Sequence, residues 1–324
     1  MAYTTIDDPT AYFQVKTYTG TGSSQAFTLD SDTDLQPDVV WIKNRGVADS
    51  WCHQNDVLGV GKTHAIDDDA AVADETDCID SFDSDGFTVD SDDKVNASSE
   101  TYVAYCWKES ATSGFDIYTY SGTGSQVTVS HSLGATPDAI LNFLNTGSAW
   151  DSTVYLDTTN MGTGKGIFMT LTNAAQSTTY VDSTTSSNFL TTNMSTSGRT
   201  YFGYALKSKQ GFSKFGSYTG NGNADGPMIF LGFRPAFIMI KRTDSTGDWG
   251  IFDNKREGYN DETNRLKPNG NDAEEDDNFM DILSNGFKLR LTSSSINASG
   301  GTFIYAAFAE APLVNSNGVP CNAR

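Results

Sequence analysis

The chain has 324 residues, with a formal net charge of −20 and a pI near 4.3. This excess of carboxylates disfavours binding to the phosphates of a nucleic acid, and we interpret it as a source of solubility in a crowded or salty medium. Aromatic residues make up 12% of the chain, which argues against disorder and provides apolar bulk for two or three domains.

The first hundred residues show the pattern of short strands joined by turns. Residues 13–18 alternate between apolar and polar types, as a half-buried strand does, and Gly20-Thr21-Gly22 is expected to supply the positive φ of a tight turn. Residues 39–42 are all apolar, which predicts a central strand buried on both faces. Asp85-Gly86-Phe87, like Asn285-Gly286-Phe287 much later, predicts a hairpin turn.

Landmarks of this first stretch recur twice more in the same order. A Tyr-x-Gly-x-Gly motif stands at 18–22, 120–124 and 218–222, a Pro followed by an apolar run at 37–43, 137–141 and 235–241, and an aromatic strand at 102–105, 201–204 and 303–306. Trp51, Trp150 and Trp249 are spaced by 99 residues. Internal similarity of this kind predicts one structural unit in three tandem copies.

The predicted fold is all-β, with three β-sandwich modules of a jelly-roll-like kind and some six to eight short strands in each. The expected division is an N-terminal segment (1–10), module one (11–112), module two (113–210), module three (211–312) and a C-terminal tail (313–324). The modules differ in charge, with net values of −14 for residues 11–110, −1 for 114–210 and −4 for 211–312. We hypothesise that module one faces solvent and module two lies against a partner.

The same landmarks resemble a module of tail and virion proteins of marine bacteriophages, including cyanophages. The resemblance rests on residues 1–14, 37–45, 85–96, 102–108 and 322–324 and extends over nearly the whole chain in three copies. It is clearest in the first copy and degenerate in the second, where Asn142-Phe143 replaces an Ile-Lys pair. The resemblance implies a phage structural protein on the exterior of the virion, and it supplies no catalytic residues.

Catalytic and nucleotide-binding patterns are weak. Residues 56–63 end like a phosphate-binding loop, but Asp56 stands where the motif needs glycine, and residues 162–166 lack its spacing. His53, His64 and His131 occupy no common position of the repeat, and no pair of carboxylates stands out for glycoside hydrolysis. We therefore expect a protein that is not an enzyme.

Calcium is the one metal that the sequence suggests. Asp30, Asp32 and Asp34 alternate like calcium ligands, although Leu35 occupies the position where an EF-hand has glycine. A second group of carboxylates surrounds the Gly86 turn: Asp83, Asp85, Asp90, Asp92 and Asp93. We interpret both groups as solvated acidic loops in preference to calcium sites, and we expect no other cofactor.

Aromatic side chains offer a means of binding glycans. The three repeated tryptophans could stack on sugars, but their presence in every copy favours one buried anchor in each sandwich core. Tyr180 and Tyr259, which are peculiar to one copy, are better candidates for glycan contact. Asn96, Asn193 and Asn297 begin sequons at corresponding sites, which we interpret as Asn/Ser turns before the last strand of each copy.

The four cysteines show no metal-binding or disulfide spacing and are expected to be reduced thiols, and no leader or membrane span is recognisable. Together these features predict a non-enzymatic structural protein on the virion surface, assembled in the host cytoplasm, as a head decoration (knob) or a tail-fibre component that assists host adsorption. Expected partners are other virion proteins, further copies of itself in a homo-oligomer, and a host surface glycan, without nucleic acid and without membrane insertion. The alternative is a carbohydrate-binding receptor-recognition module or a depolymerase of a phage tail.

Overall fold

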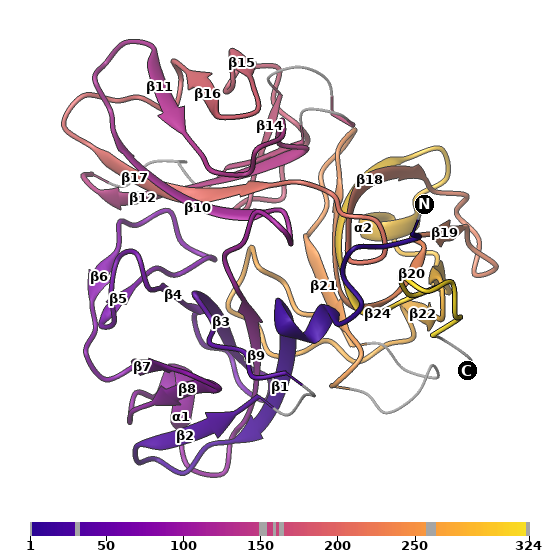
Figure 1. The fold of residues 1–324 in the computed structure, drawn as a ribbon, viewed down its shortest axis with the longest axis horizontal. Helices are drawn as coiled ribbons and strands as arrows, with labels where there is room; N and C mark the ends of the chain where they lie inside the picture. The colour runs from indigo at the N-terminus through magenta and orange to yellow at the C-terminus, as the bar shows by residue number, and fades with distance from the viewer. Residues whose placement is uncertain are drawn as a thin grey trace.

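The computed structural model describes residues 2–29, 33–148, 154–157, 160–161, 165–256 and 264–321. The strands in these ranges form antiparallel sheets, so the predicted all-β, sandwich-type class is confirmed. Figure 1 shows three groups of strands arranged around a common centre, in violet, magenta and orange to yellow along the chain. We call them the first, second and third sandwiches.

The first sandwich pairs a four-stranded sheet with a three-stranded one. The larger sheet contains, in spatial order, β1 (Phe13–Thr19), β9 (Thr101–Trp107), β3 (Val39–Asn44) and β4 (Cys52–Asn55). The smaller sheet contains β2 (Gln25–Thr28), β8 (Gly86–Val89) and β7 (Ile79–Asp83). A short ribbon, β5 (Lys62–Thr63) with β6 (Ala73–Asp74), and one helical turn, α1 (Asp93–Asn96), complete it, and η1 (Pro9–Ala11) precedes it.

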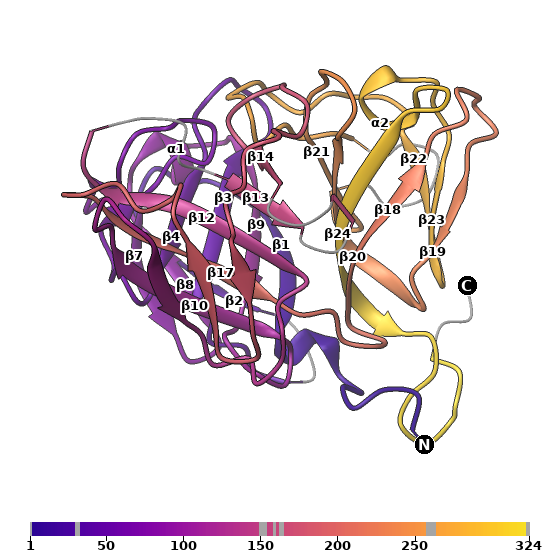
Figure 2. The ribbon, with the colours of Figure 1, turned by 90° about the horizontal axis from the view of Figure 1, so that it is seen from above.

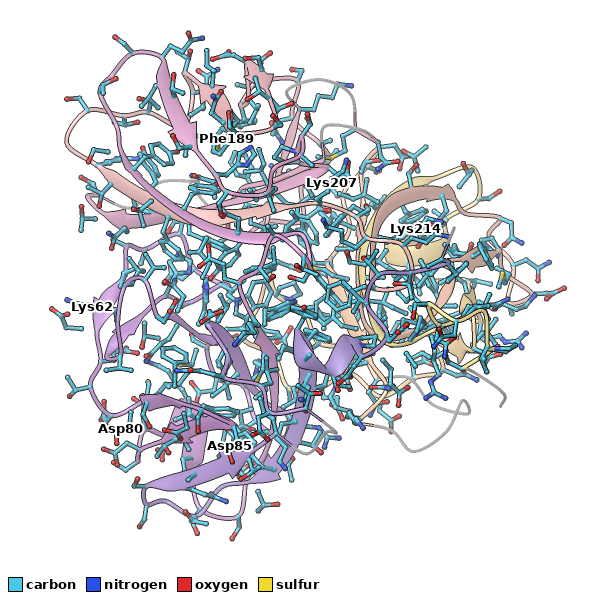
Figure 3. The ribbon with its side chains drawn as sticks, in the orientation of Figure 1. Lys62, Asp80, Asp85, Phe189, Lys207 and Lys214 are labelled. Atoms are coloured by element: carbon cyan, nitrogen blue, oxygen red, sulfur yellow. The ribbon has the colours of Figure 1, made fainter. Side chains whose placement is uncertain are left out.

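The second sandwich has the same plan with one more strand in its larger sheet. Its larger sheet contains β10 (Phe115–Ser121), β17 (Thr200–Leu206), β12 (Ala139–Thr146), β13 (Val154–Asp157) and β14 (Gly166–Phe168). Its smaller sheet contains β11 (Val127–Ser130), β16 (Asn188–Thr191) and β15 (Ser183–Thr184). Figure 3 shows the side chain of Phe189, which is fully buried, between these two sheets.

The third sandwich closes the molecule. Its larger sheet contains β18 (Ser213–Thr219), β24 (Thr302–Pro312), β20 (Phe233–Arg242) and β21 (Gly250–Asp253). Its smaller sheet contains β19 (Met228–Phe230), β23 (Gly286–Leu289) and β22 (Met280–Leu283), and the helical turn α2 (Ser294–Asn297) lies before the last strand. In all three larger sheets the first, last, third and fourth strands of the group lie side by side in that order. The exact limits of the proposed modules remain a prediction.

The glycine motif of each copy has two different local roles. Gly22, the second glycine of the first motif, has a φ of 74°, as the sequence predicts for a tight turn. Gly20 instead approaches the backbone so closely that an added Cβ would lie 2.3 Å from the carbonyl oxygen of Ala97. Gly122 and Gly220 meet the same obstacle in the other two motifs, so this position requires glycine for space and not for a positive φ.

The predicted central strand, β3, is buried on both faces. Its residues alternate between two cores, because successive side chains of a strand point to opposite faces. Val40 and Ile42 face the smaller sheet and belong to the core of the first sandwich, whereas Val39 and Trp41 belong to a cluster shared by all three sandwiches. The second face of each larger sheet is therefore covered by neighbouring sandwiches and not by its own smaller sheet.

Aromatic rings from the three sandwiches meet at the centre of the molecule. The ring of Trp107 lies 6.4 Å from Phe115 of the second sandwich, and 5.6 and 5.9 Å from Phe237 and Phe308 of the third. Phe13 packs on the same rings, 5.0 Å from Trp107 and 5.3 Å from Phe308. The cavity left between the sandwiches is only about 20 Å³ and is lined by apolar side chains, so the centre is a packed core and not a channel.

The three sandwiches also form a closed ring through their loops. One backbone hydrogen bond recurs at every junction, in which the amides of Val72, Ala175 and Glu274 donate to the carbonyl oxygens of Asn145, Thr243 and Arg45 over 3.1, 3.0 and 2.9 Å, respectively. Each acceptor lies at the end of the third strand of a larger sheet. The first sandwich thus donates to the second, the second to the third and the third to the first, which gives the single chain an approximate threefold arrangement (Figure 1).

An ion-pair network strengthens the junction between the third and first sandwiches. Arg45 donates from Nε and Nη2 to the two carboxylate oxygens of Glu274, each over 3.0 Å, and Arg256 donates to the same carboxylate over 2.8 Å. Burial opposes the ionisation of Glu274, but these guanidinium groups hold its pKa at about 2. In the same junction the hydroxyl of Tyr105 donates to Asp253 over 2.8 Å.

The repeated tryptophans are buried, but not where the sequence predicts. Trp51 and Trp249 are at most 1% exposed, yet they belong to the central cluster and not to the core of a single sandwich. Their indole N–H groups donate across junctions, from Trp51 to the carbonyl oxygen of Lys267 over 3.1 Å and from Trp249 to that of Phe168 over 2.9 Å. An indole has an apolar body and one donor, which suits a position between two packed units. Trp150 lies outside the described residues.

The N-terminal segment is attached to the third sandwich and the tail. The hydroxyl of Tyr3 donates to the carbonyl oxygen of Gly232 over 2.7 Å, and that of Thr4 donates to Gln210 over 2.8 Å. The amide of Ser316 in the tail donates to Asp7 over 2.6 Å. Both ends of the described chain therefore lie beside the third sandwich, as Figure 2 shows.

Replacing Trp107 by Ala is expected to destabilise all three sandwiches together. Because this side chain is 4% exposed and its ring contacts both neighbouring sandwiches, its loss leaves a central cavity and costs about 3–5 kcal/mol of unfolding free energy. Urea unfolding followed by fluorescence and circular dichroism measures this. Val57→Ala, at a side chain 48% exposed, is the control, with a change of about 0.5 kcal/mol or less. Separate transitions, with only one sandwich weakened by the Trp107 substitution, would contradict a shared core.

Candidate ligand-binding site

A pocket of about 500 Å³ opens on the second sandwich at the end where its glycine motif turns. Its walls come from the loop before β17 (192–199), from the loop that leads to β15 and from the strands β12, β14 and β17. The volume is within the range of about 300–1,000 Å³ that is usual for small-molecule sites. The pocket therefore has the dimensions of a ligand-binding site.

A short connection creates this pocket. In the first sandwich the side chain of Asn96, at the end of α1, accepts a hydrogen bond from the amide of Thr21 over 2.8 Å, and Asn297 does the same in the third. In the second sandwich the equivalent acceptor is the hydroxyl of Ser195, which binds the amide of Thr123 over 3.0 Å. Ser195 lies four residues after the end of β16, whereas Asn96 lies seven residues after the end of β8. The helical turn of the other two sandwiches therefore does not fit, and the residues that replace it line the pocket.

Aromatic rings form part of the pocket lining. The ring of Tyr201, 2% exposed, stacks on Tyr120 with its centroid 4.9 Å away, and its hydroxyl accepts a hydrogen bond from the amide of Thr196 over 3.2 Å. Tyr180 packs edge to face against Phe168 at 6.0 Å. The carbonyl oxygen of Tyr180 accepts a hydrogen bond from the buried hydroxyl of Thr191 over 2.6 Å, which fixes the loop. These rings are held in place before any ligand binds.

The polar lining carries a single ionised side chain within the part of the chain that the structure describes. Arg199 is the charged residue among those that line the pocket, and the rest of the polar lining consists of hydroxyl and amide groups. Its backbone is fixed, because its carbonyl oxygen accepts from the amide of Gly122 over 2.9 Å. Outside the lining, Asp182 accepts hydrogen bonds from the side chains of Thr192 and Gln126 over 2.8 and 3.0 Å. The described lining thus combines an apolar floor, neutral polar groups and one cation.

One of the two predicted glycan contacts lies in this pocket. Tyr180 forms part of its wall, 9% exposed, whereas Tyr259 lies outside the described residues. Sequence reasoning did not identify Arg199 or Tyr201 as site residues. The signal that could have revealed them is the shorter connection of the second copy, visible as the missing residues between its strand at 188–191 and its aromatic strand at 200–206.

The predicted calcium site at Asp30, Asp32 and Asp34 stays a prediction. Asp34 is exposed, while Asp30 and Asp32 lie outside the described ranges. In the second acidic group, Asp83 accepts hydrogen bonds from Ser81 and Thr88, and Asp92 caps α1 by accepting from the amide of Lys94. Within the described part of the chain no group of three potential ligands lies close enough to hold a metal ion.

The predicted correspondence of the three sequons is wrong. Asn96 and Asn297 do occupy equivalent positions, but both are fully buried, and the side-chain amide of Asn96 donates to the carbonyl oxygens of Ser23 and Asp90 over 2.6 and 2.7 Å. Their counterpart in the second sandwich is Ser195 and not Asn193, which is exposed. The shortened connection shifts the sequon by two positions.

Two histidines meet at the junction between the first and second sandwiches. His53 and His64 are each 1% exposed, with ring centroids 5.7 Å apart, and both pack on Phe143. The Nε2 of His53 shares a hydrogen bond with the hydroxyl of Tyr204. Burial lowers the pKa of His53 well below its ordinary value, and that of His64 to about 4. Enclosed by aromatic rings, the pair has a structural role and does not face the pocket.

The segment that ends like a phosphate-binding loop has another structure. Residues 56–61 form turns, and Lys62 and Thr63 belong to β5, which pairs with β6 and not with a helix. Lys62 forms an ion pair with Asp74 and lies on the outer surface of the first sandwich (Figure 3). Residues 56–63 are therefore a turn followed by a short strand and not a phosphate-binding loop. In the second candidate segment, Gly162–Gly164 lie outside the described residues.

The histidine junction predicts a loss of stability in acid. The folded-state pKa of His64 is about 4 and its ordinary value is 6.5, so the unfolded chain binds a proton that the folded chain excludes. The contribution is present above pH 6.5 and is lost as the pH falls towards 4. His64→Leu, which installs the residue found at the equivalent position 266, should reduce this loss by up to about 1.4 kcal/mol per pH unit, measured by urea unfolding across the range.

The matched control for this measurement is Phe143→Leu. It weakens packing on the same histidines but removes no titrating group, so it should lower stability by a similar amount at every pH. An identical pH dependence in His64→Leu and the unsubstituted chain would show that the pair is not the acid-sensitive group.

No helix in the described part of the chain is long and apolar enough to cross a membrane. Searches of the curated proteins and of the solved structures give no significant match. A family model, described as a domain of unknown function (DUF7483), matches residues 8–312 in one span that covers all three sandwiches. The chain therefore belongs to the DUF7483 family.

Proposed function

We propose that this chain is a non-enzymatic structural protein of a bacteriophage particle, exposed on its surface as a head decoration or as a tail-fibre component. The observation that supports this proposal most directly is the closed ring of three sandwiches around one aromatic core. A single chain with approximate threefold symmetry can occupy a threefold position of a symmetric particle, where a trimer would otherwise be needed. The resemblance of its sequence landmarks to phage virion modules points to the same role.

Differences in charge between the sandwiches suggest how the protein is oriented. Lys62, Asp80 and Asp85 mark the surface of the first sandwich in Figure 3, and residues 11–110 carry 20 carboxylates against 6 basic side chains. The second sandwich is nearly neutral, with 5 carboxylates and 4 basic side chains in residues 114–210. Packing of a nearly neutral surface against other virion proteins, or against another copy in a homo-oligomer, avoids the repulsion that the first sandwich would cause.

Glycan binding in host adsorption is the second function that an observation favours. The observation is the pocket of the second sandwich, which combines aromatic rings with polar groups. This pocket supports a receptor-recognition role within the same surface protein. To separate recognition from depolymerase activity, the protein is incubated with polysaccharide and any released oligosaccharides are analysed.

Labelling of the protein on intact particles tests the location. Gold-labelled antibody against the purified chain, imaged by electron microscopy, is expected to bind the particle exterior without disruption of the particle. Label confined to the tail would refute head decoration, and label confined to the head would refute a fibre. Particles that bind no antibody until they are opened would contradict surface exposure altogether.

The charge division predicts unequal protection of the sandwiches in the assembled particle. Hydrogen exchange of assembled and free protein, compared peptide by peptide, should show added protection in the second sandwich and little change at the acidic surface of the first. Added protection concentrated on the loops and smaller sheet of the first sandwich would overturn the proposed orientation.

A further inference from the structure

We infer that the pocket of the second sandwich binds an acidic saccharide of about one or two sugar rings. The inference is drawn from the pocket itself. Only the expectation that the saccharide belongs to a host surface glycan rests on the proposed function.

The size and placement of the pocket fit a short saccharide. Its volume is about 500 Å³, and it lies in a loop region at one end of the second sandwich. In the first and third sandwiches α1 and α2 supply the residues of the equivalent connection. The shorter connection thus leaves a recess where the first and third sandwiches have a helical turn.

The lining offers the chemistry that a pyranose ring requires. The rings of Tyr180 and Tyr201, 9% and 2% exposed, form an apolar floor against which the C–H groups of a sugar can pack. Thr178 and Thr192 are exposed at the opening and provide hydroxyl groups, and Asn193 provides an amide. Sugar hydroxyls both donate and accept hydrogen bonds, so a lining of neutral donors and acceptors matches them better than a lining of like charges.

The charge of the lining selects an acidic sugar over a neutral one. Among the described residues that line the pocket, Arg199 is the only ionised side chain, in a chain whose net charge is −20. A guanidinium group can bind a carboxylate through two parallel hydrogen bonds, and such charge-assisted bonds are about twice as strong as neutral ones. A neutral sugar lacks the carboxylate that forms this bidentate, charge-assisted pair, so it gains less from the arginine.

The site is organised in advance, which lowers the entropic cost of binding. Thr191 holds the loop of Tyr180 through its hydroxyl and also accepts from the amide of Met194 over 3.2 Å. The side chain of Asn193 ties the two loops together by donating to the carbonyl oxygen of Thr179 over 2.5 Å. Ligand binding therefore does not have to order these walls.

Calorimetric titration of the full-length chain with two matched disaccharides tests the inference. The probes are digalacturonic acid and the corresponding neutral galactobiose, which differ in their carboxylate and hydroxymethyl groups. Digalacturonic acid is expected to bind with a Kd below about 1 mM, and galactobiose at least about tenfold more weakly. Arg199→Gln should weaken binding of the acidic probe by about 10–100-fold and leave that of the neutral probe unchanged.

Two further variants keep the test independent of folding defects. Thr178→Trp places a large ring at an exposed position of the opening, so the protein should fold normally, by circular dichroism, and lose binding of both probes. Lys62→Gln, on the first sandwich, removes one positive charge far from the pocket and should bind like the unsubstituted chain (Figure 3).

Three outcomes would overturn the inference: no binding of digalacturonic acid up to millimolar concentration, equal affinity for the two probes, or binding unchanged by both Arg199→Gln and Thr178→Trp. These outcomes are distinct from a failure of the proposed function. If the chain binds the acidic disaccharide but is absent from phage particles, the saccharide site is supported and the virion role is refuted. If the chain is found on particles but binds neither probe, the virion role is supported and the saccharide site is refuted.

Discussion

The packing of Trp107 against Phe115, Phe237 and Phe308 is the contact on which the rest of the structure depends. Each larger sheet has two apolar faces, and its own smaller sheet covers only one of them. The other face is buried when the three larger sheets meet, because apolar surface left in water costs about 25 cal/mol per Å². A single sandwich would therefore expose half of its central strand, and the family model accordingly spans residues 8–312 as one unit.

Junctions between the sandwiches follow one plan with different chemistry. The same backbone hydrogen bond is present three times, but the groups around it differ. Arg45 and Glu274 form a partly exposed ion pair at one junction, and Lys241 donates to the carbonyl oxygen of Thr172 over 2.9 Å at another. At the third junction Phe143 takes the place of that lysine and packs on the histidine pair. Divergence of the copies has thus produced three unlike interfaces in place of three identical ones.

The sequence was sufficient for the features that depend on local pattern. The continuous apolar run at 39–42 predicted a strand buried on both faces, and the Gly86 and Gly286 turns predicted hairpins, which β7–β8 and β22–β23 confirm. Periodicity could not tell which unit would cover each face, so the tryptophans were assigned to the wrong core. It also could not show that Asn142 would line a pocket while its neighbour Phe143 entered a junction, because that division depends on the packing of sheets distant in sequence.

The ring arrangement has a consequence for how the chain folds. Arg45 and Glu274, which close the junction between the first and third sandwiches, are 229 residues apart in sequence. While the chain is being synthesised, the first two sandwiches can form before their partners at this junction exist, and the apolar faces that await the third are left in water. Contacts of such long range slow folding, and exposed sheet faces promote aggregation. The last third of the chain therefore completes the shared core. A ribosome that stalls before this part is synthesised would release an aggregation-prone intermediate.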